Sequence, residues 1–206
     1  MREIYFFMKG LIIGLSVAVP VGPIGILCIR RTLNQGRLIG FLSGLGAATA
    51  DAWYGAIAGF GLTFLSNFLI GQQTGIRLIG GVLLCAIGVR MFVSKPAKRG
   101  GSAESSSLWS AYLSTFFLTL TSPLTILFFA AVFAGLGVGS SGSHYLSAAI
   151  LVSGVFTGSA LWWLILSRLT GLLRGMFSDQ GLQWLNRIAG LIIIGFGLVA
   201  FWSLLR

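Results

Sequence analysis

Asp51 is the residue of this sequence with the clearest capacity for chemistry, because it alone among the acids lies deep within an apolar stretch. The chain has four acidic residues, and the others are Glu3, Glu104 and Asp179. Asp51 follows Arg37 by about 21 Å at helical rise, which places it near the middle of a bilayer. A carboxylate at that depth costs on the order of 3 kcal/mol to insert. The position predicts a group that handles a cation or a proton, with a protonated residue that only packs two helices as the alternative.

Small residues surround Asp51 and leave space beside it. They recur at helical spacing along the same segment, at Gly44, Ala47, Ala48 and Gly55. Tyr54 follows Asp51 by three residues and adds a hydroxyl to that face. We therefore expect room for a neighbouring helix or a small solute against the acid.

Prolines interrupt the first apolar segment close to the predicted depth of Asp51. Pro20 and Pro23 lack an amide hydrogen, so the carbonyls four residues before them, including that of Ser16, lose their usual helical donors. Ser16 precedes Arg30 by the same 14 residues that separate Asp51 from Arg37, so we expect both oxygens at one depth. Together they would suit one ammonium group or cation.

A proline also interrupts the fourth apolar segment. Pro123 should free the carbonyl of Thr119, which lies in a segment rich in hydroxyls, namely Ser114, Thr115, Thr121, Ser122 and Thr125. The alternative is that these prolines only kink transmembrane helices for packing.

The composition of the chain is that of a membrane protein. Hydrophobic residues make up 56% and charged residues only 9%, with a mean hydropathy of +0.94. The net charge of +10 lies in short clusters between apolar runs, which is a topological pattern and not a nucleic-acid interface. Cys28, Cys85 and the single His144 form no metal-ligand or redox motif, so we expect no metal, no cofactor and no enzyme activity.

Six segments are apolar and long enough to cross a bilayer. They run near 5–29, 38–66, 75–94, 108–135, 146–167 and 187–205. The third segment has the shortest uncharged stretch, because only 12 residues separate Arg77 from Arg90. A five-helix arrangement, in which this segment does not cross the bilayer, therefore stays open. The fold class is therefore an all-α membrane protein with about six transmembrane helices.

The basic residues set the orientation of these spans. With six spans, ten of the 14 fall on one side, and only Arg2, Lys9, Arg77 and Arg206 fall on the other. The positive-inside rule places the richer side in the cytoplasm and both termini in the periplasm.

Two connectors on the basic side have distinctive compositions. Residues 95–107 are charged and rich in Gly and Ser, which predicts a cytoplasmic linker between a first repeat (1–94) and a second (108–206). Between Thr170 and Asn186, apolar and polar residues alternate as in an interfacial helix, with a partly buried loop as the alternative.

Two offsets of the chain against itself indicate an internal repeat. An offset of 110 aligns Gly44 with Gly154, Trp53 with Trp163, Arg77 with Arg187 and Gly80 with Gly190, and an offset of 100 aligns Pro23 with Pro123. Equivalent connectors differ in positive charge. Because three helices is an odd number, a second copy must enter the membrane from the opposite side, which predicts the inverted repeats common in secondary transporters.

Glycines and tryptophans are numerous enough to need interpretation. Glycine pairs four residues apart, such as Gly154 and Gly158, favour close helix packing within one chain and leave a homodimer open. We expect the tryptophans in interfacial belts or helix packing and not in a ligand site, including Trp109, Trp162, Trp163 and Trp202.

The motifs together resemble the LysE/RhtB superfamily of lysine and homoserine/threonine exporters. They are Pro20, Gly22 and Pro23 in VPVGPIG, the turn Gly36-Arg37, Asp51 in GLGAATADAWYG, and Pro123 in SPLTILFF. The chain departs from the superfamily pattern by the insertion of Val21 and by Ser122 and Leu124 in place of Asn and Lys. The resemblance covers most of the chain.

This resemblance implies proton-driven export of basic or small neutral amino acids across the bacterial inner membrane. The residues expected at the site of substrate or proton coupling are Asp51, Ser16, Pro20, Gly22, Pro23, Tyr54, Thr119, Ser122 and Pro123. A metal or inorganic cation exporter is the first alternative, for which one membrane carboxylate is a thin ligand set. A membrane assembly or redox protein is the second.

Overall fold

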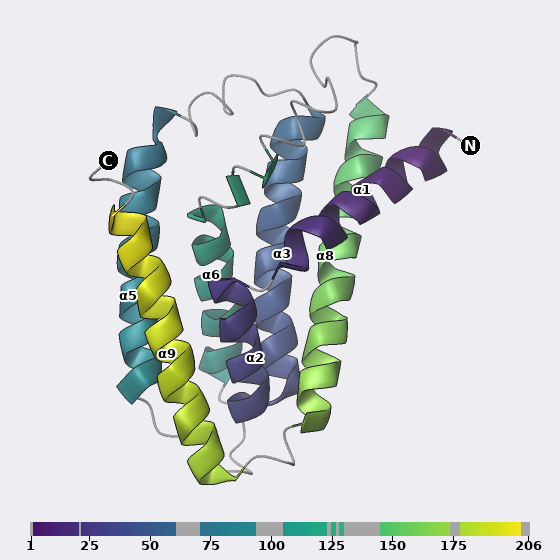
Figure 1. Cartoon of the computed structure of the whole chain (residues 1–206). Coiled ribbons are helices and arrows are strands. Elements are labelled where there is room, and N and C mark those ends of the chain that lie inside the picture. Colours follow the sequence, from purple (N-terminus) through teal and green to yellow (C-terminus); the bar gives the residue numbers. More distant parts are fainter. Residues whose placement is uncertain are drawn as a thin grey trace.

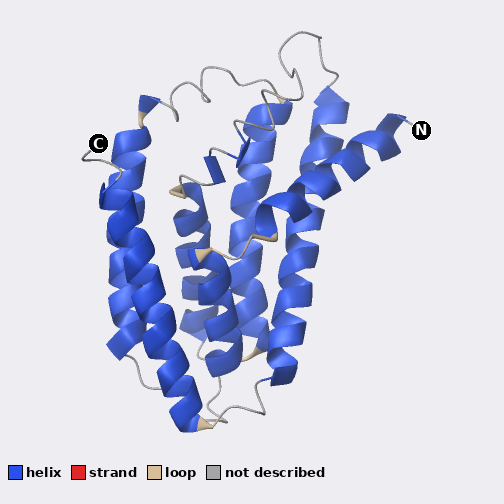
Figure 2. Ribbon diagram, in the orientation of Figure 1, coloured by secondary structure: helices blue, strands red, loops and turns tan. Residues whose placement is uncertain are grey.

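The computed structural model describes residues 2–20, 22–60, 71–93, 105–122, 125–126, 128–129, 145–173 and 178–202. Across these ranges the chain forms seven helices. Figure 2 shows that the described elements are helices, with no strand among them. The helices are α1 (Arg2–Ala18), α2 (Pro23–Gln35), α3 (Arg37–Gly59), α5 (Gln73–Val93), α6 (Ser105–Leu120), α8 (Tyr145–Leu173) and α9 (Asp179–Trp202). The predicted all-α class is confirmed for this part of the chain.

The first predicted span, 5–29, is two helices that meet at an angle of 80°. The last amide bonded in α1 is that of Val19, which donates to the carbonyl of Leu15, and Pro20 has no amide hydrogen with which to continue the ladder. Gly22 then takes an extended conformation, and Pro23 occupies the first turn of α2, where a missing amide hydrogen costs nothing. Figure 1 shows α1 inclined and α2 aligned with the other helices.

Helix α2 continues six residues beyond the predicted end of the span. The prediction ended at residue 29 because Arg30 and Arg31 follow, but both guanidinium groups bond to other helices of the protein. Paired in this way, they do not force the helix to end. The turn comes instead at Gly36, whose φ of 107° favours glycine, and α3 begins at the next residue.

Helix α3 lies at the centre of the bundle and packs against α6 on one side and α8 on the other (Figure 1). Helix α1 packs along α8, and α5 packs along α9. Helix α2 fills the space between these pairs, with contacts to α3, α8 and α9. The most extensive contacts therefore join helices of the first half to helices of the second half.

Glycines set the close approach of α1 to α8. A Cβ atom on Gly10 or Gly14 would overlap backbone atoms of α8, and one on Gly154 or Gly158 would overlap backbone atoms of α1. The prediction that the pair Gly154/Gly158 packs within one chain is confirmed.

The connector between the fifth and sixth spans differs from both expectations. Helix α8 continues through Thr170 to Leu173, and α9 begins at Asp179, so the segment expected as an interfacial helix or a loop is largely the ends of two long helices. Residues 174–177 lie outside the described residues. Leu172 and Trp184 of this segment are exposed on the outer faces of those helices, whereas Leu182 is buried.

Length and composition identify α8 and the Gln180–Val199 part of α9 as helices able to cross a membrane. The bent pair α1 and α2 passes the same test when the two helices are taken together, as a broken span or a re-entrant loop. Leu78–Val93 and Leu108–Leu120 are shorter apolar helices. Large apolar side chains on the outer faces are exposed, as suits contact with lipid, for example at Val82, Val89, Ile188 and Leu191.

Candidate functional site

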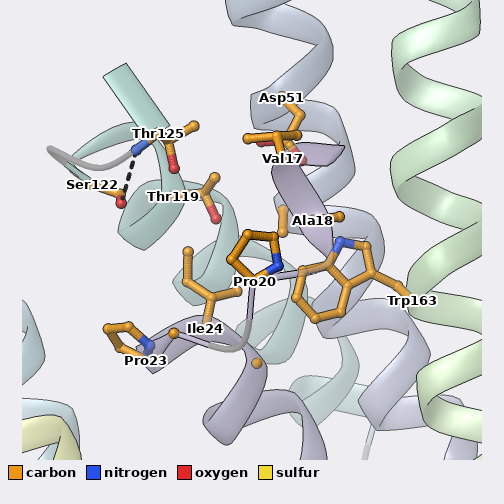
Figure 3. A pocket seen from close by; sticks show the side chains of 13 residues that line it. Val17, Ala18, Pro20, Pro23, Ile24, Asp51, Thr119, Ser122, Thr125 and Trp163 are labelled. Carbon is orange, nitrogen blue, oxygen red and sulfur yellow. Dashed lines mark hydrogen bonds between the residues drawn. The ribbon is translucent and has the colours of Figure 1, made fainter. Parts of the chain in front are cut away.

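A pocket of about 50 Å³ lies at the break between α1 and α2 (Figure 3). By volume it has room for about three or four water molecules. The break and α3 supply part of the wall, and the end of α6 with α8 supplies the rest. The lining residues are Val17, Ala18, Pro20, Gly22, Pro23, Ile24, Gly25, Ala47, Asp51, Thr119, Ser122, Thr125 and Trp163.

Asp51 is the acidic residue of this pocket, and it is only 3% exposed. The hydroxyl of Ser159, on α8, donates a hydrogen bond of 2.7 Å to its Oδ2 atom. The indole Nε1 of Trp163, one turn further along α8, donates to the Ser159 hydroxyl oxygen over 3.2 Å. The carboxylate is therefore oriented by a hydrogen-bonded chain from the second half of the protein.

Trp163 fixes the direction of these two hydrogen bonds. An indole nitrogen can only donate, so Ser159 accepts from Trp163 and has its single proton left for Asp51. Oδ2 is then occupied by a donor, while the carboxylate retains further acceptor capacity. Asp51 lines the pocket and can offer that capacity to an ammonium group, a cation or a proton.

Three hydroxyl groups face Asp51 across the pocket. Thr119 donates its hydroxyl proton to the carbonyl of Thr115, and the amide of Thr125 donates to the Ser122 oxygen at 3.5 Å. Both contacts are local to the chain around the end of α6, and Figure 3 shows the side chains of Thr119, Ser122 and Thr125 on the same side of Pro20. They give the pocket a neutral polar wall.

The amino end of α2 forms the floor of the pocket. The first amide of α2 to bond within the helix is that of Ile26, which donates to the carbonyl of Gly22. The amides of Ile24 and Gly25 precede this bond, and both residues line the pocket. A helix amino end carries partial positive charge and suits an anionic group such as a carboxylate.

Six predicted site residues come together here. They are Asp51, Pro20, Gly22, Pro23, Thr119 and Ser122. Two others do not line the pocket, namely Ser16 and Tyr54, and Pro123 lies outside the described residues.

Ser16, whose carbonyl we expected at the depth of Asp51, does not line the pocket. Ser16 is exposed, on the side of α1 opposite to the buried Gly14 and Ala18. Counting residues from an arginine gives a depth along the helix axis, but it does not give the direction in which a residue faces.

Two further expectations about this region need correction. The Thr119 carbonyl is not free, because the amide of Ser122 donates to it over 3.1 Å. Tyr54 is buried, but its hydroxyl donates to the carbonyl of Leu120 over 2.6 Å. Tyr54 therefore ties α3 to the end of α6 and does not face the pocket.

The sequence interpretation missed Ser159 and the second role of Trp163. Trp163 is 5% exposed and packs between helices, which was one of the two expected alternatives. It also lines the pocket, which we did not expect. The available signal was the spacing of four residues between Ser159 and Trp163, which puts a hydroxyl and an indole on one face of α8. Among the described residues, no group of three or more His, Cys, Asp or Glu side chains is placed to hold a metal ion.

A helical fold with a polar pocket at a broken helix is typical of membrane transporters. Comparison with known sequences identifies the family, since the LysE type translocator profile matches residues 15–203. The chain belongs to the LysE type translocator family, whose members are transporters and not enzymes.

Two curated relatives agree with this assignment. The chain is 27% identical to the "Putative amino acid efflux protein YcgF" of Bacillus subtilis, over 93% of this chain and 92% of the relative. It is 30% identical to the "Uncharacterized membrane protein YahN" of Escherichia coli, over 52% of this chain and 49% of the relative. No solved structure matches.

Proposed function

We propose that this protein exports amino acids, either basic or small and neutral, across the bacterial inner membrane in exchange for protons. The observation that carries the proposal is the meeting of a buried carboxylate with a helix amino end in one pocket. Membership of the translocator family and the name of the B. subtilis relative support export.

Both charged groups of an amino acid have a complementary partner in the pocket. The ammonium group would bind Asp51, and the carboxylate would accept hydrogen bonds from the amides of Ile24 and Gly25. A pocket of about 50 Å³ suits these two groups and little more, so a long side chain needs a wider conformation. The hydroxyls of Thr119 and Ser122 would contact the side chain.

Coupling to protons follows from competition for one carboxylate. Asp51 has either a proton or the substrate ammonium as its partner, because the pocket is small and Ser159 already occupies Oδ2. Binding of substrate from the cytoplasm would displace the proton, and a proton entering from the periplasm would displace the substrate. Each cycle would then exchange one for the other.

We further propose that the protein has six spans arranged as two inverted repeats, 1–94 and 108–206, joined by the linker 95–107. The packing supports a two-fold relation, because α1 lies along α8 as α6 lies along α3. The pairs α3 with α8 and α5 with α9 join equivalent helices of the two repeats. The charge distribution supports periplasmic termini.

Thermal stability of the purified protein in detergent tests the proposal against its rival, export of a metal cation. We expect L-threonine or L-lysine to stabilise the protein, by about 2.7 kcal/mol at 100 times Kd. Ethanolamine, which lacks a carboxylate, and lactate, which lacks an ammonium group, should have little effect. Asp51→Asn should abolish the stabilisation by amino acids. Stabilisation by divalent metals alone would contradict amino acid export and support the rival.

A further inference from the structure

A second polar cluster lies beneath the pocket, where α2, α3 and α6 meet. Its centre is the guanidinium group of Arg31, whose partners lie on α3 and α6. Its Nη1 atom donates to Ser43, Ala111 and Thr115, each over 2.9 Å, and its Nη2 atom donates to Ser114 over 2.8 Å. One side chain thus ties three helices together.

The cluster lies on helices that line the pocket, at the ends that the charge distribution places in the cytoplasm. Ser43 precedes Asp51 by about two turns of α3, and Thr115 precedes Thr119 by about one turn of α6. Cys28, between the pocket and Arg31 on α2, is 3% exposed and packs in a cluster with Ala47 and Trp163 of the pocket wall. Arg31 and its partners on α3 and α6 therefore lie between the buried Cys28 and the end of α2 that the charge distribution places in the cytoplasm.

The partners of Arg31 can release it without leaving a donor unsatisfied. Ser43 donates its own proton to the carbonyl of Ile39, and Ser114 and Thr115 donate theirs to carbonyls of α6. These hydroxyls therefore act only as acceptors for the guanidinium. Arg31 is different, because its donors need replacement acceptors when it leaves.

The charges around Arg31 favour an anion as the replacement. Its partners are neutral oxygens, and no carboxylate contacts it among the residues described. Arg30 and Arg90 lie close enough to interact with it electrostatically, which makes this end of the bundle strongly positive. A guanidinium group binds a carboxylate through two parallel hydrogen bonds, which are stronger than bonds to neutral oxygens.

We propose that Arg31 is a second binding site for the carboxylate of the substrate, at the cytoplasmic entrance of the pocket. The incoming carboxylate replaces the four neutral oxygens, and release of the three-helix tie opens the way to Asp51. Arg31 is thus the inner gate and the group that makes its opening depend on substrate. The inference rests on the proposed function and on the cytoplasmic placement of residues 30–37.

Cys28 provides a native reporter of this gate. With Cys85→Ala it is the only cysteine of the chain, and it can be labelled in inverted membrane vesicles with a membrane-impermeant thiol reagent. In this background we expect slow labelling without substrate and labelling at least about threefold faster with saturating L-threonine or L-lysine. The corresponding amino acid amides, which lack the carboxylate, should not accelerate it.

Variants of Arg31 distinguish a role in the gate from a role in the overall fold. Arg31→Gln should label about tenfold faster than the parent without any amino acid, as expected for loss of charge-assisted hydrogen bonds, and amino acids should add nothing. Arg31→Lys retains the charge and Ser114→Ala removes one acceptor, so both should give intermediate rates. Arg168→Gln removes an exposed arginine of α8 near the same end and should behave as the parent.

Equal labelling of Cys28 in the parent and in Arg31→Gln would overturn the inference, as would equal acceleration by an amino acid and its amide. Either result in vesicles that still accumulate the amino acid would leave the proposed function intact. Vesicles that accumulate neither L-threonine nor L-lysine would contradict the proposed function itself.

Discussion

Asp51 depends on its neighbours for its orientation. A carboxylate that is 3% exposed is costly unless its oxygens find donors, and Ser159 provides one from a different helix. Trp163 directs that donor by occupying the hydroxyl oxygen. The geometry of the proposed transport site therefore includes two residues of the second half of the chain.

Ser159→Ala tests this dependence. Removal of the hydroxyl leaves a buried carboxylate oxygen without its donor, so we expect a loss of about 1–3 kcal/mol in stability and weaker binding of amino acids. Ser153→Ala is a matched control, because Ser153 is an exposed serine of α8 whose hydroxyl bonds only to the nearby carbonyl of Ile150. The midpoint of heat aggregation in detergent should fall for the first variant and stay constant for the second. Equal midpoints would argue against a structural role for the bond.

The site residues differ in how far the sequence reveals them. Asp51 could be found because a carboxylate is rare in an apolar segment, and Pro20 and Pro23 because they stop a helix locally. Ser159 was missed, because its role depends on the rotation of α8 against α3, and a serine in a transmembrane helix is ordinary. Its spacing of four residues from Trp163 is the signal that the sequence offers. Ser16 was assigned by the depth of its carbonyl alone, and depth along the helix axis does not give the direction in which a residue faces.

Helix α8 is the element against which much of the bundle is built, since α1 and α3 both pack along it. Its contact with α1 depends on glycines because the two backbones touch. A Cβ atom on Gly158 would overlap the carbonyl oxygen of Leu11, whereas one on Gly195 of α9 would meet no atom within 4 Å.

The same substitution at these two glycines should have opposite effects. Gly158→Ala forces α1 away from α8, so we expect a loss of about 1–3 kcal/mol in stability. Gly195→Ala finds open space and gains helix propensity, so stability should stay the same or rise by up to about 1 kcal/mol. The fraction of protein that remains soluble in detergent after heating measures both. A stable Gly158→Ala variant would mean that α1 does not pack on α8 as described.

At the scale of elements, the sequence predicts helices well and their ends poorly. The apolar segments predicted at least one end of each of five helices to within a few residues. These helices are α3, α5, α6, α8 and α9. Charged residues misled the prediction of ends, since α2 extends past Arg31 and α8 past Arg168. The hydrogen-bond partners of Arg31 lie on other helices. The hydropathy of its own segment therefore carries no information about them.

The arrangement of the whole molecule makes its two halves interdependent. The helices of the proposed repeats interleave, so the pocket takes its carboxylate from one half and the donor that orients it from the other. The proposed repeats are also unequal, because Leu161 stands where the offset of 110 would place a second acid. We therefore expect any handling of a proton or an ammonium group to depend on Asp51 of the first repeat.

Amino acid transport in proteoliposomes under an imposed pH gradient tests the central claim, that Asp51 couples the substrate to the proton. Asp51→Asn keeps an acceptor for Ser159 and cannot titrate, so the fold should persist while gradient-driven transport of L-threonine or L-lysine falls to background. Asp51→Glu, which retains a carboxylate, should keep part of the activity. Transport by Asp51→Asn that still responds fully to the gradient, at equal insertion, would contradict the account.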